Sequence, residues 1–165
     1  MSWRGYTIDG QFYCLAHLQK KTIEVEIDSA SVKLHLSYSG HCFTDDKENG
    51  PIILPRENRY WCHDRYELSK GLPDMIEQGL ISSYAIPHFA GKNNEQYHYM
   101  EAFDYAIFFT VRKPNNTTNE LNLRIASAYP VETWGKGSMP RGSAKRVSWI
   151  LSKRLKGESV LGKKK

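Results

Sequence analysis

The sequence has few cysteines and no arrangement that would link them. Cys14, Cys42 and Cys62 are odd in number, and no two of them are spaced as CxxC. A disulfide framework needs paired cysteines, and a closed zinc site needs several ligands at short spacings. The pattern therefore predicts reduced thiols, which are typical of a cytoplasmic protein.

Long apolar runs are also missing. No segment approaches the ~18 apolar residues that are needed to cross a bilayer. The first ten residues, MSWRGYTIDG, contain no apolar stretch typical of a secretory signal. We therefore expect a cytoplasmic chain that has no membrane partner.

Several catalytic and cofactor-binding motifs are absent. The chain contains no GxGxxG, GxxxxGK[ST], HExxH or GxSxG sequence, so phosphate-loop nucleotide binding, zincin chemistry and the α/β-hydrolase nucleophile have no signature. Asp45 and Asp46 are adjacent, but Lys47 and Glu48 follow them, and such a run is typical of a solvated turn. We therefore expect neither a metal nor a cofactor.

The positive charge is concentrated near the C-terminus. The formal net charge is +5, yet residues 133–165 hold ten Lys or Arg and a single acid, Glu158. The rest of the chain holds thirteen bases and seventeen acids. An acidic-leaning body with a basic C-terminal region predicts a polyanionic partner, most simply RNA and alternatively DNA.

Short alternating segments dominate the body of the chain and predict a β-rich fold. Strands are expected over 12–18, 22–27, 31–39, 105–111 and 121–129. The turn sequence DSAS predicts that the second and third of these form a hairpin. Polar and Gly-rich stretches predict loops over 40–51 and 85–96.

Two helical regions complete the expected fold. Residues 63–80 show an apolar stripe with Asp64 as the predicted cap, and Pro73 predicts a kink or two short helices. Ser143 is the predicted cap of a basic amphipathic helix over 144–156. The class is therefore α+β, with a mainly antiparallel sheet. We expect one domain over 1–158 and a basic flexible tail over 159–165.

The stretch RIASAYP, residues 124–130, ends an apolar strand with polar side chains. In a regular strand, Ser127 and Tyr129 continue the core-facing stripe, whereas Arg124 points to the other face unless a bulge re-aims it. A pair of hydroxyls at the margin of a sheet can bind a phosphate or position a base. Arg124, Ser127 and Tyr129 are therefore candidate catalytic residues.

Two of the six histidines are candidates for proton transfer. His41 follows the strand 31–39 directly, and His63 precedes a helix with Arg65 close by. An imidazole on the rim of a cleft titrates near neutral pH, as general acid–base catalysis requires. The other four histidines are expected to be packed or on the surface, and His88 is placed in a packed turn.

The basic C-terminal region supplies candidate contacts to nucleic acid. Basic side chains there can bind phosphates with a salt-dependent affinity, and an exposed Trp can stack on a base. The candidates are Trp134, Lys136, Arg141, Lys145, Arg146 and Lys153.

The order of a helix, the strand YAIFFTVRK and a strand that ends in SAYP resembles the barnase–EndoU–colicin–RelE group of toxin ribonucleases. Separately, HCFT (41–44), DRYELSKGLPDMI (64–76) and SAY (127–129) are similar to a family of small, mostly uncharacterised proteins of bacterial mobile elements. The second resemblance implies no function. The first implies metal-independent RNA cleavage, in which the ribose 2′-OH attacks the adjacent phosphate, and it assigns Ser127 and Tyr129 to the site.

The sequence thus predicts a toxin-like endoribonuclease in a toxin–antitoxin or phage-defence setting, kept in check by an inhibitory protein partner. Two other classes stay open. One is a non-catalytic nucleic-acid-binding or accessory protein of a mobile element, which needs only the basic region and the aromatics. The other is a protein–protein inhibitor module that uses the edge of the hairpin 22–38. The oligomeric state is open as well.

Overall fold

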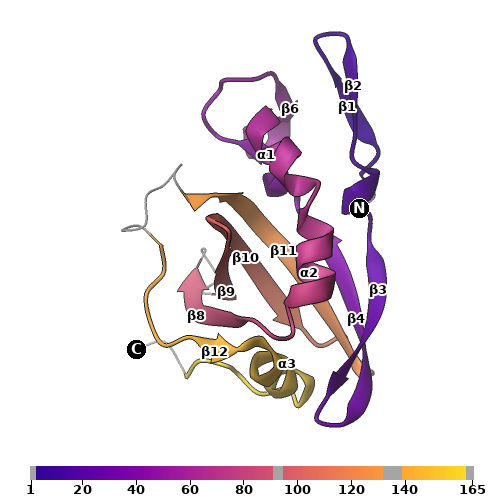
Figure 1. Ribbon diagram of the computed structural model, residues 1–165, viewed down its shortest axis with the longest axis vertical. Helices are drawn as coiled ribbons and strands as arrows, with labels where there is room; N and C mark the ends of the chain where they lie inside the picture. The colour runs from indigo at the N-terminus through magenta and orange to yellow at the C-terminus, as the bar shows by residue number, and fades with distance from the viewer. Residues whose placement is uncertain (1–2, 91–94, 132–138, 163–165) are drawn as a thin grey trace.

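A seven-stranded mixed sheet forms the centre of the protein in the computed structural model, which describes residues 3–90, 95–131 and 139–162 (Figure 1). The strand order is β12-β8-β9-β10-β11-β4-β3, and every pairing is antiparallel except that of β11 with β4. This confirms the α+β class and the mainly antiparallel sheet. The strands are β3 Lys21–Ile27, β4 Ala30–Tyr38, β8 Tyr84–Ala90, β9 Glu95–Ala102, β10 Tyr105–Arg112, β11 Glu120–Pro130 and β12 Lys145–Arg146.

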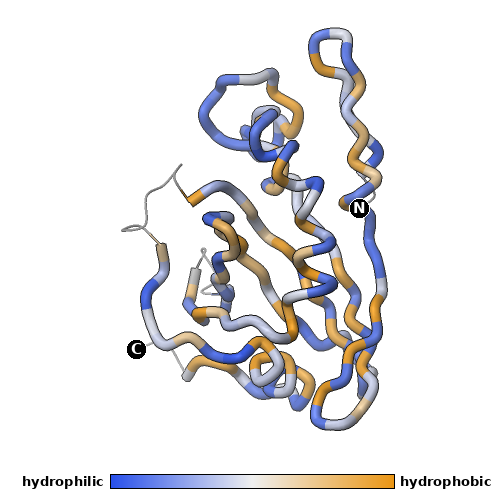
Figure 2. Tube along the Cα trace, in the orientation of Figure 1, coloured by the Kyte–Doolittle hydropathy of each residue, from blue (hydrophilic) through white to orange (hydrophobic). Residues whose placement is uncertain are grey.

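Two smaller sheets lie beside the large one. The hairpin of β1 (Gly5–Ile8) and β2 (Gln11–Cys14) projects from the body in Figure 1. The second small sheet contains β5 (Thr44–Asp45), β6 (Ile52–Leu54) and β7 (Arg59–Trp61). Its loop before β6 is hydrophilic, as Figure 2 shows. Three single-turn 3₁₀ helices, η1 (Ala16–Leu18), η2 (Gly40–Cys42) and η3 (Pro55–Glu57), connect the strands.

The hairpin of β3 and β4 was predicted correctly. Its loop contains only Asp28 and Ser29, and both have positive φ angles, 51° and 66°. Two consecutive residues with positive φ are typical of the type I′ turn, whose twist matches that of the flanking strands. The predicted strand 12–18 is only partly correct, because β2 ends at Cys14 and a 3₁₀ turn follows.

The predicted loop over 85–96 is wrong, because most of it forms β8 and the start of β9. Pro87 suggested a loop since it has no backbone N–H for a sheet ladder. It is tolerated because β8 pairs with β9 from Ile86 to Ala90 but with β12 only at Tyr84 and Ala85, so that Pro87 has a neighbouring strand on one side only. Pro87 therefore lies in a strand that is almost an edge strand.

The middle helical region divides into α1 (His63–Ser69) and α2 (Leu72–Gly79), in agreement with the effect expected of Pro73. The predicted cap Asp64 lies inside α1, whose N-cap is Cys62 without a side-chain capping bond. The C-terminal helix α3 is shorter than predicted and spans Val147–Leu155. Ser143 does not cap α3, since the chain first pairs with β8 as β12 and the Val147 N–H donates to the Ser83 carbonyl.

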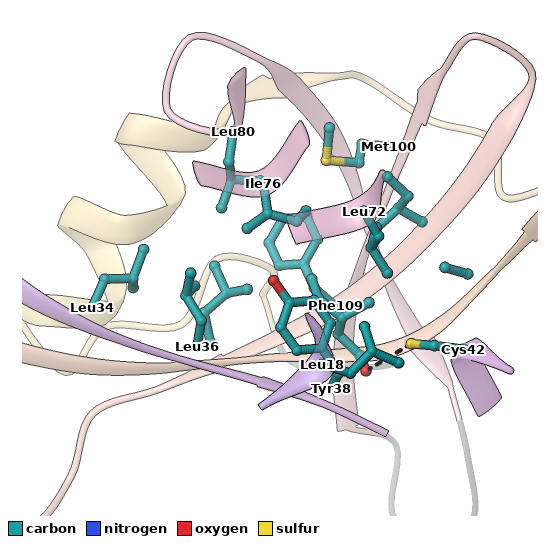
Figure 3. Packing of buried hydrophobic residues seen from close by; sticks show 14 of the residues in the cluster. Leu18, Leu34, Leu36, Tyr38, Cys42, Leu72, Ile76, Leu80, Met100 and Phe109 are labelled. Carbon is teal, nitrogen blue, oxygen red and sulfur yellow. Dashed lines mark hydrogen bonds between the residues drawn. The ribbon is translucent and has the colours of Figure 1, made fainter. Parts of the chain in front are cut away.

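The core lies between one face of the large sheet and the helices. Leu36 and Phe109 of the sheet lie opposite Ile76 of α2 and Leu80, the C-cap of α2 (Figure 3), and all four are at most 1% exposed. Burial of each such side chain contributes about 1.5–3 kcal/mol. Val147, Ile150 and Leu151 of α3 join the same cluster. Along the described chain, none of the helices is long and apolar enough to cross a membrane.

The chain beyond α3 is also held against the sheet. The backbone N–H groups of Val160 and Leu161 donate to Gln96 Oε1 on β9, at 3.1 Å and 3.0 Å. Val160 packs against the core as well. The first residues of the expected tail therefore contact the domain.

Candidate active site on the open face of the sheet

A β-bulge in β11 decides which side chains form the candidate site. Phe108 of β10 pairs with Ser127, whereas the next residue, Phe109, pairs with Ile125, so Ala126 is an extra residue in β11. Such an insertion inverts the alternation of side chains beyond it. Ile125 and Ala128 are both fully buried in the core.

Ser127 and Tyr129 therefore lie on the same face of the sheet as Arg124. The expectation for a regular strand, with Ser127 and Tyr129 in the core stripe and Arg124 opposite, is wrong. The bulge brings the three residues together, away from the face that α2 and α3 cover.

The bulge is held by the segment that follows β4. The Ser39 backbone N–H donates to the Ile125 carbonyl at 2.9 Å, and the Ser39 hydroxyl donates to the Ala126 carbonyl at 2.5 Å. The same hydroxyl oxygen accepts the backbone N–H of His41 at 3.1 Å. Backbone carbonyls at a bulge lose their ladder partners, and Ser39 supplies donors in their place. Because Ser39 also accepts the His41 N–H, it holds His41 beside the bulge.

The residues around the bulge enclose a depression of about 410 Å³, which we call the Tyr129 pocket. It contains four of the six predicted catalytic residues. Its lining consists of Ser39, His41, Glu57, His88, Tyr97, Phe108, Arg124, Ala126, Ser127 and Tyr129.

His41 has the environment of a general base. Burial lowers the pKa of the imidazole and the Arg59 guanidinium lowers it further, while a hydrogen bond to Glu57 opposes both effects. The Nε2–Oε1 distance to Glu57 is 3.2 Å. His41 is therefore neutral at neutral pH, and Glu57 can stabilise the charge that it acquires on taking up a proton.

Tyr129 has the environment of a proton donor. Its ring stacks on Phe108 with a centroid distance of 5.7 Å, and the Arg65 guanidinium lies 4.8 Å from the ring centroid. Burial raises the pKa of the phenol, against the opposing charge of Arg65. The hydroxyl is therefore protonated across the neutral range.

Arg124 lies on the exposed surface of β11 and reaches the pocket from its floor. Among the described residues, no acidic side chain forms an ion pair with it. A guanidinium in this position can bind the oxygens of a phosphate with two donors. Ser127 of the same strand also lines the pocket and adds a hydroxyl group.

Arg65, another of the predicted catalytic residues, is buried beside the segment that carries His41. It is only 3% exposed, and its Nη1 donates to the carbonyls of His41 (3.1 Å) and Thr44 (2.7 Å). It therefore joins α1 to the segment that carries His41 and also packs on Tyr129. It does not line the Tyr129 pocket but borders a neighbouring depression of about 740 Å³.

His63 is not brought together with the other candidates. Its side chain is 54% exposed and lies 3.6 Å from Glu67 in the same helix. The ring packs edge-on against Tyr13, in the neighbouring depression that Arg65 borders.

His88 is a pocket residue that the sequence interpretation missed. It lies on β8 opposite Tyr97, and burial lowers the pKa of its imidazole. Nδ1 lies 3.3 Å from the Ile86 carbonyl, to which it donates in the tautomer that carries the proton on Nδ1. Ile86 and His88 are spaced as in a strand, and this spacing could have predicted the position of His88. Pro87 between them suggested a loop instead.

The predicted nucleic-acid contacts lie elsewhere. Arg141, Lys145 and Arg146 are exposed, while Lys153 is half-buried and pairs with Glu158 at 3.0 Å. None of these four side chains lines the Tyr129 pocket. Trp134 and Lys136 lie outside the described residues.

The part of the chain that the structure describes contains no group of three or more His, Cys, Asp or Glu side chains arranged to hold a metal ion. The lining of the Tyr129 pocket offers imidazole, guanidinium, hydroxyl, phenol and carboxylate groups. Together these can accept a proton, donate a proton and stabilise a negatively charged phosphate.

Comparison with known proteins places the chain in a family. The Escherichia coli (strain K12) protein YjaZ is 28% identical over 120 residues, which are 62% of this chain and 62% of that protein. The chain thus spans less than two thirds of the length of this curated relative, and no solved structure gives a significant match. The name states no activity, so the resemblance to toxin ribonucleases stays a prediction. The family model matches residues 5–155, from the start of β1 to the end of α3, and the chain therefore belongs to the YjaZ family.

Proposed function

We propose that this protein is a metal-independent endoribonuclease that acts in the cytoplasm and cleaves RNA by attack of a ribose 2′-OH. The observation that carries the proposal is the bulge at Ala126, which gathers His41, Arg124, Ser127 and Tyr129 in one pocket. These are the chemical groups that such a reaction needs: a neutral base, a cation for the phosphate and a protonated acid.

The reaction assigns one role to each group. Neutral His41 removes the proton of the 2′-OH, and the oxygen attacks the adjacent phosphorus. Arg124 stabilises the charge of the pentacoordinate phosphorane, with Ser127 as an additional donor. The P–O5′ bond breaks as Tyr129 donates its proton to the leaving oxygen. The products are a 2′,3′-cyclic phosphate and a free 5′-OH.

The test is the incubation of purified protein with a defined single-stranded RNA in the presence of EDTA. Mass spectrometry should detect 2′,3′-cyclic phosphate ends, and an RNA with a 2′-deoxyribose at the cleaved position should stay intact. His41→Asn should lose about 10²-fold or more in rate. His63→Asn, which changes an exposed histidine outside the pocket, serves as the matched control.

A toxin-like role is the biological part of the proposal. It predicts that expression arrests growth in cells, that His41→Asn abolishes the arrest, and that an inhibitory protein partner relieves it. Growth that is unaffected by the wild-type protein, together with intact RNA in vitro, would rule out the ribonuclease.

A second candidate function, non-catalytic nucleic-acid binding, is favoured by the surface of β12 and α3. Trp149 is 39% exposed, with Lys145 Nζ at 5.8 Å and Lys153 Nζ at 5.5 Å from the ring centroid. Arg146 lies over Tyr84 at 5.5 Å. Aromatic rings beside cations suit single-stranded nucleic acid, which stacks its bases and binds through its phosphates.

The second candidate makes a separate prediction. The double variant Lys145→Ala, Lys153→Ala should weaken RNA binding and reduce its dependence on salt, and the wild-type protein should leave the bound RNA intact. Binding that is the same in the double variant would assign a structural role to this surface.

A further inference from the structure

A second depression adjoins the Tyr129 pocket on the same face of the sheet. It has a volume of about 710 Å³, and we call it the wide depression. It shares Tyr97, Arg124 and Ala126 with the Tyr129 pocket, so the two form one continuous groove. Its lining also includes Thr22, His35, Arg112 and Asn122.

Strand β11 runs along the floor of the whole groove. Asn122 and Arg124 lie in the wide depression, and Arg124, Ser127 and Tyr129 lie in the pocket. At about 3.3 Å per residue, the floor from Asn122 to Tyr129 is about 20 Å long. The groove therefore accommodates more than one nucleotide.

The walls of the wide depression are fixed by hydrogen bonds. His35 Nδ1 lies 2.7 Å from Thr22 Oγ1, and His35 Nε2 lies 2.9 Å from Glu120 Oε1. Since both ring nitrogens are engaged, the imidazole is held as a rigid plane rather than as a free base. On β10, Arg112 is held by an ion pair with Glu95.

Asn122 lies at the centre of these fixed groups. It is exposed and pairs in register with His35 on one neighbouring strand and with Arg112 on the other. A carboxamide offers both a donor and an acceptor, and it can bond two atoms on the edge of a base. Arg124, two residues along the strand, lies at the boundary of the two depressions, where a guanidinium can bind a phosphate.

We infer that the wide depression is the subsite for the nucleotide adjoining the scissile phosphate, with Asn122 contacting the edge of its base. The substrate is then single-stranded RNA laid along β11, with a phosphate at Arg124. In an A-form duplex the Watson–Crick edge of each base is paired and the deep, narrow major groove is closed to side chains, so a base that enters this depression is unpaired. Tyr97 and the fixed ring of His35 provide faces on which it stacks. This inference rests on the proposed function.

The test uses 2′-O-methyl tetramers of A, C, G and U, in which the nucleophile is blocked, and inorganic phosphate, which has no base, as a probe of the Tyr129 pocket alone. Wild-type protein should bind at least one tetramer in preference to the others. Asn122→Ala should weaken that tetramer about tenfold and remove the preference. Binding of inorganic phosphate should be unchanged, and Asn115→Ala, in the exposed β10–β11 loop, should behave as wild type.

The outcomes separate this inference from the proposed function. Equal binding of all tetramers by wild type and Asn122→Ala, with RNA still cleaved, would overturn the subsite and leave the catalytic assignment standing. A base preference that Asn122→Ala removes, in a protein that leaves unmodified RNA intact, supports the subsite and overturns the catalysis. Asn122→Ala should have the same unfolding temperature as the wild type, which shows that the comparison is made between folded proteins.

Discussion

The Ser39 hydroxyl donates a 2.5 Å hydrogen bond to the carbonyl of Ala126, the extra residue of the β11 bulge, across 87 residues of sequence. This contact joins the two parts of the candidate site. Ala126 re-aims Ser127 and Tyr129, and Ser39 places His41 beside them. The parallel pairing of β4 with β11 makes the contact available, because the chain leaves β4 next to the bulge.

Replacement of Ser39 by Ala should therefore reduce both stability and cleavage. The variant loses the donor to Ala126 and the acceptor for the His41 N–H, which costs about 1–3 kcal/mol of unfolding free energy for partly buried groups. Displacement of His41 should lower the cleavage rate about a hundredfold. Urea unfolding and single-turnover cleavage measure the two effects.

Ser39→Thr is the matched control, since it keeps the hydroxyl and should retain most of the activity. A Ser39→Ala protein that is destabilised but cleaves at the wild-type rate would separate the bulge contact from the position of His41.

Replacement of Tyr129 by Phe tests the proton donor without disturbing the packing. The ring keeps its stack on Phe108 and its contact with Arg65. Stability should therefore change by less than about 1 kcal/mol, while the cleavage rate falls about 10²-fold or more. Tyr97→Phe removes a phenol from the same pocket and is the control. Equal rates for the two variants would mean that Tyr129 does not supply the proton.

Sequence periodicity predicts much of the fold because burial on a sheet depends on simple alternation. The hairpin of β3 and β4, the strands β10 and β11, and the basic helix α3 follow from it. The bulge does not, because an inserted Ala looks the same as its neighbours in the stretch RIASAYP. Only the pairing with Phe108 and Phe109 shows that Ala126 is extra.

The site was predicted in part for the same reason. His41 was identified from its position directly after a strand, and Arg124, Ser127 and Tyr129 from their place at a strand end. His88 was missed because Pro87 suggested a loop, and its place in the pocket depends on strand pairing that local sequence does not encode. Arg65 was predicted as a catalyst, but its burial and its bonds to two carbonyls come from long-range packing.

His98 should make the stability of the protein depend on pH. It is 1% exposed, and burial, followed by the nearby His88 and Arg154, lowers the pKa of its imidazole to about 4 from 6.5. Between these values the unfolded chain binds a proton that the folded protein does not, so stability falls as pH falls. The loss at pH 4 is about 3 kcal/mol relative to pH 7.

Urea unfolding at pH 7, 5.5 and 4 of wild type and of His98→Gln isolates this contribution from that of other groups. The wild type should lose more stability than the variant. His63→Gln changes an exposed histidine and should follow the wild type. Parallel curves for wild type and His98→Gln would show that His98 takes up its proton equally well in the folded protein.

The pH dependence of cleavage should shift in opposite directions when Arg59 and Glu57, two of the charged neighbours of His41, are replaced one at a time. Because the proposed reaction uses His41 as a neutral base, the rate should rise as pH increases through its pKa, which burial and Arg59 lower and Glu57 raises. Arg59→Gln removes a positive charge, so the pKa rises and the acid limb of the rate profile moves to higher pH. Glu57→Gln removes the carboxylate, so the limb moves to lower pH.

The double variant Arg59→Gln, Glu57→Gln is the matched control, since the two shifts should largely cancel. Single-turnover rates between pH 4.5 and 8 give the midpoint of the limb for each protein. If Glu57 and Arg59 had a purely structural role, their replacement would lower the rate at every pH without moving the midpoint. Shifts of the same sign in both single variants would assign the acid limb to a group other than His41, and His88 would then be the next imidazole of the Tyr129 pocket to test.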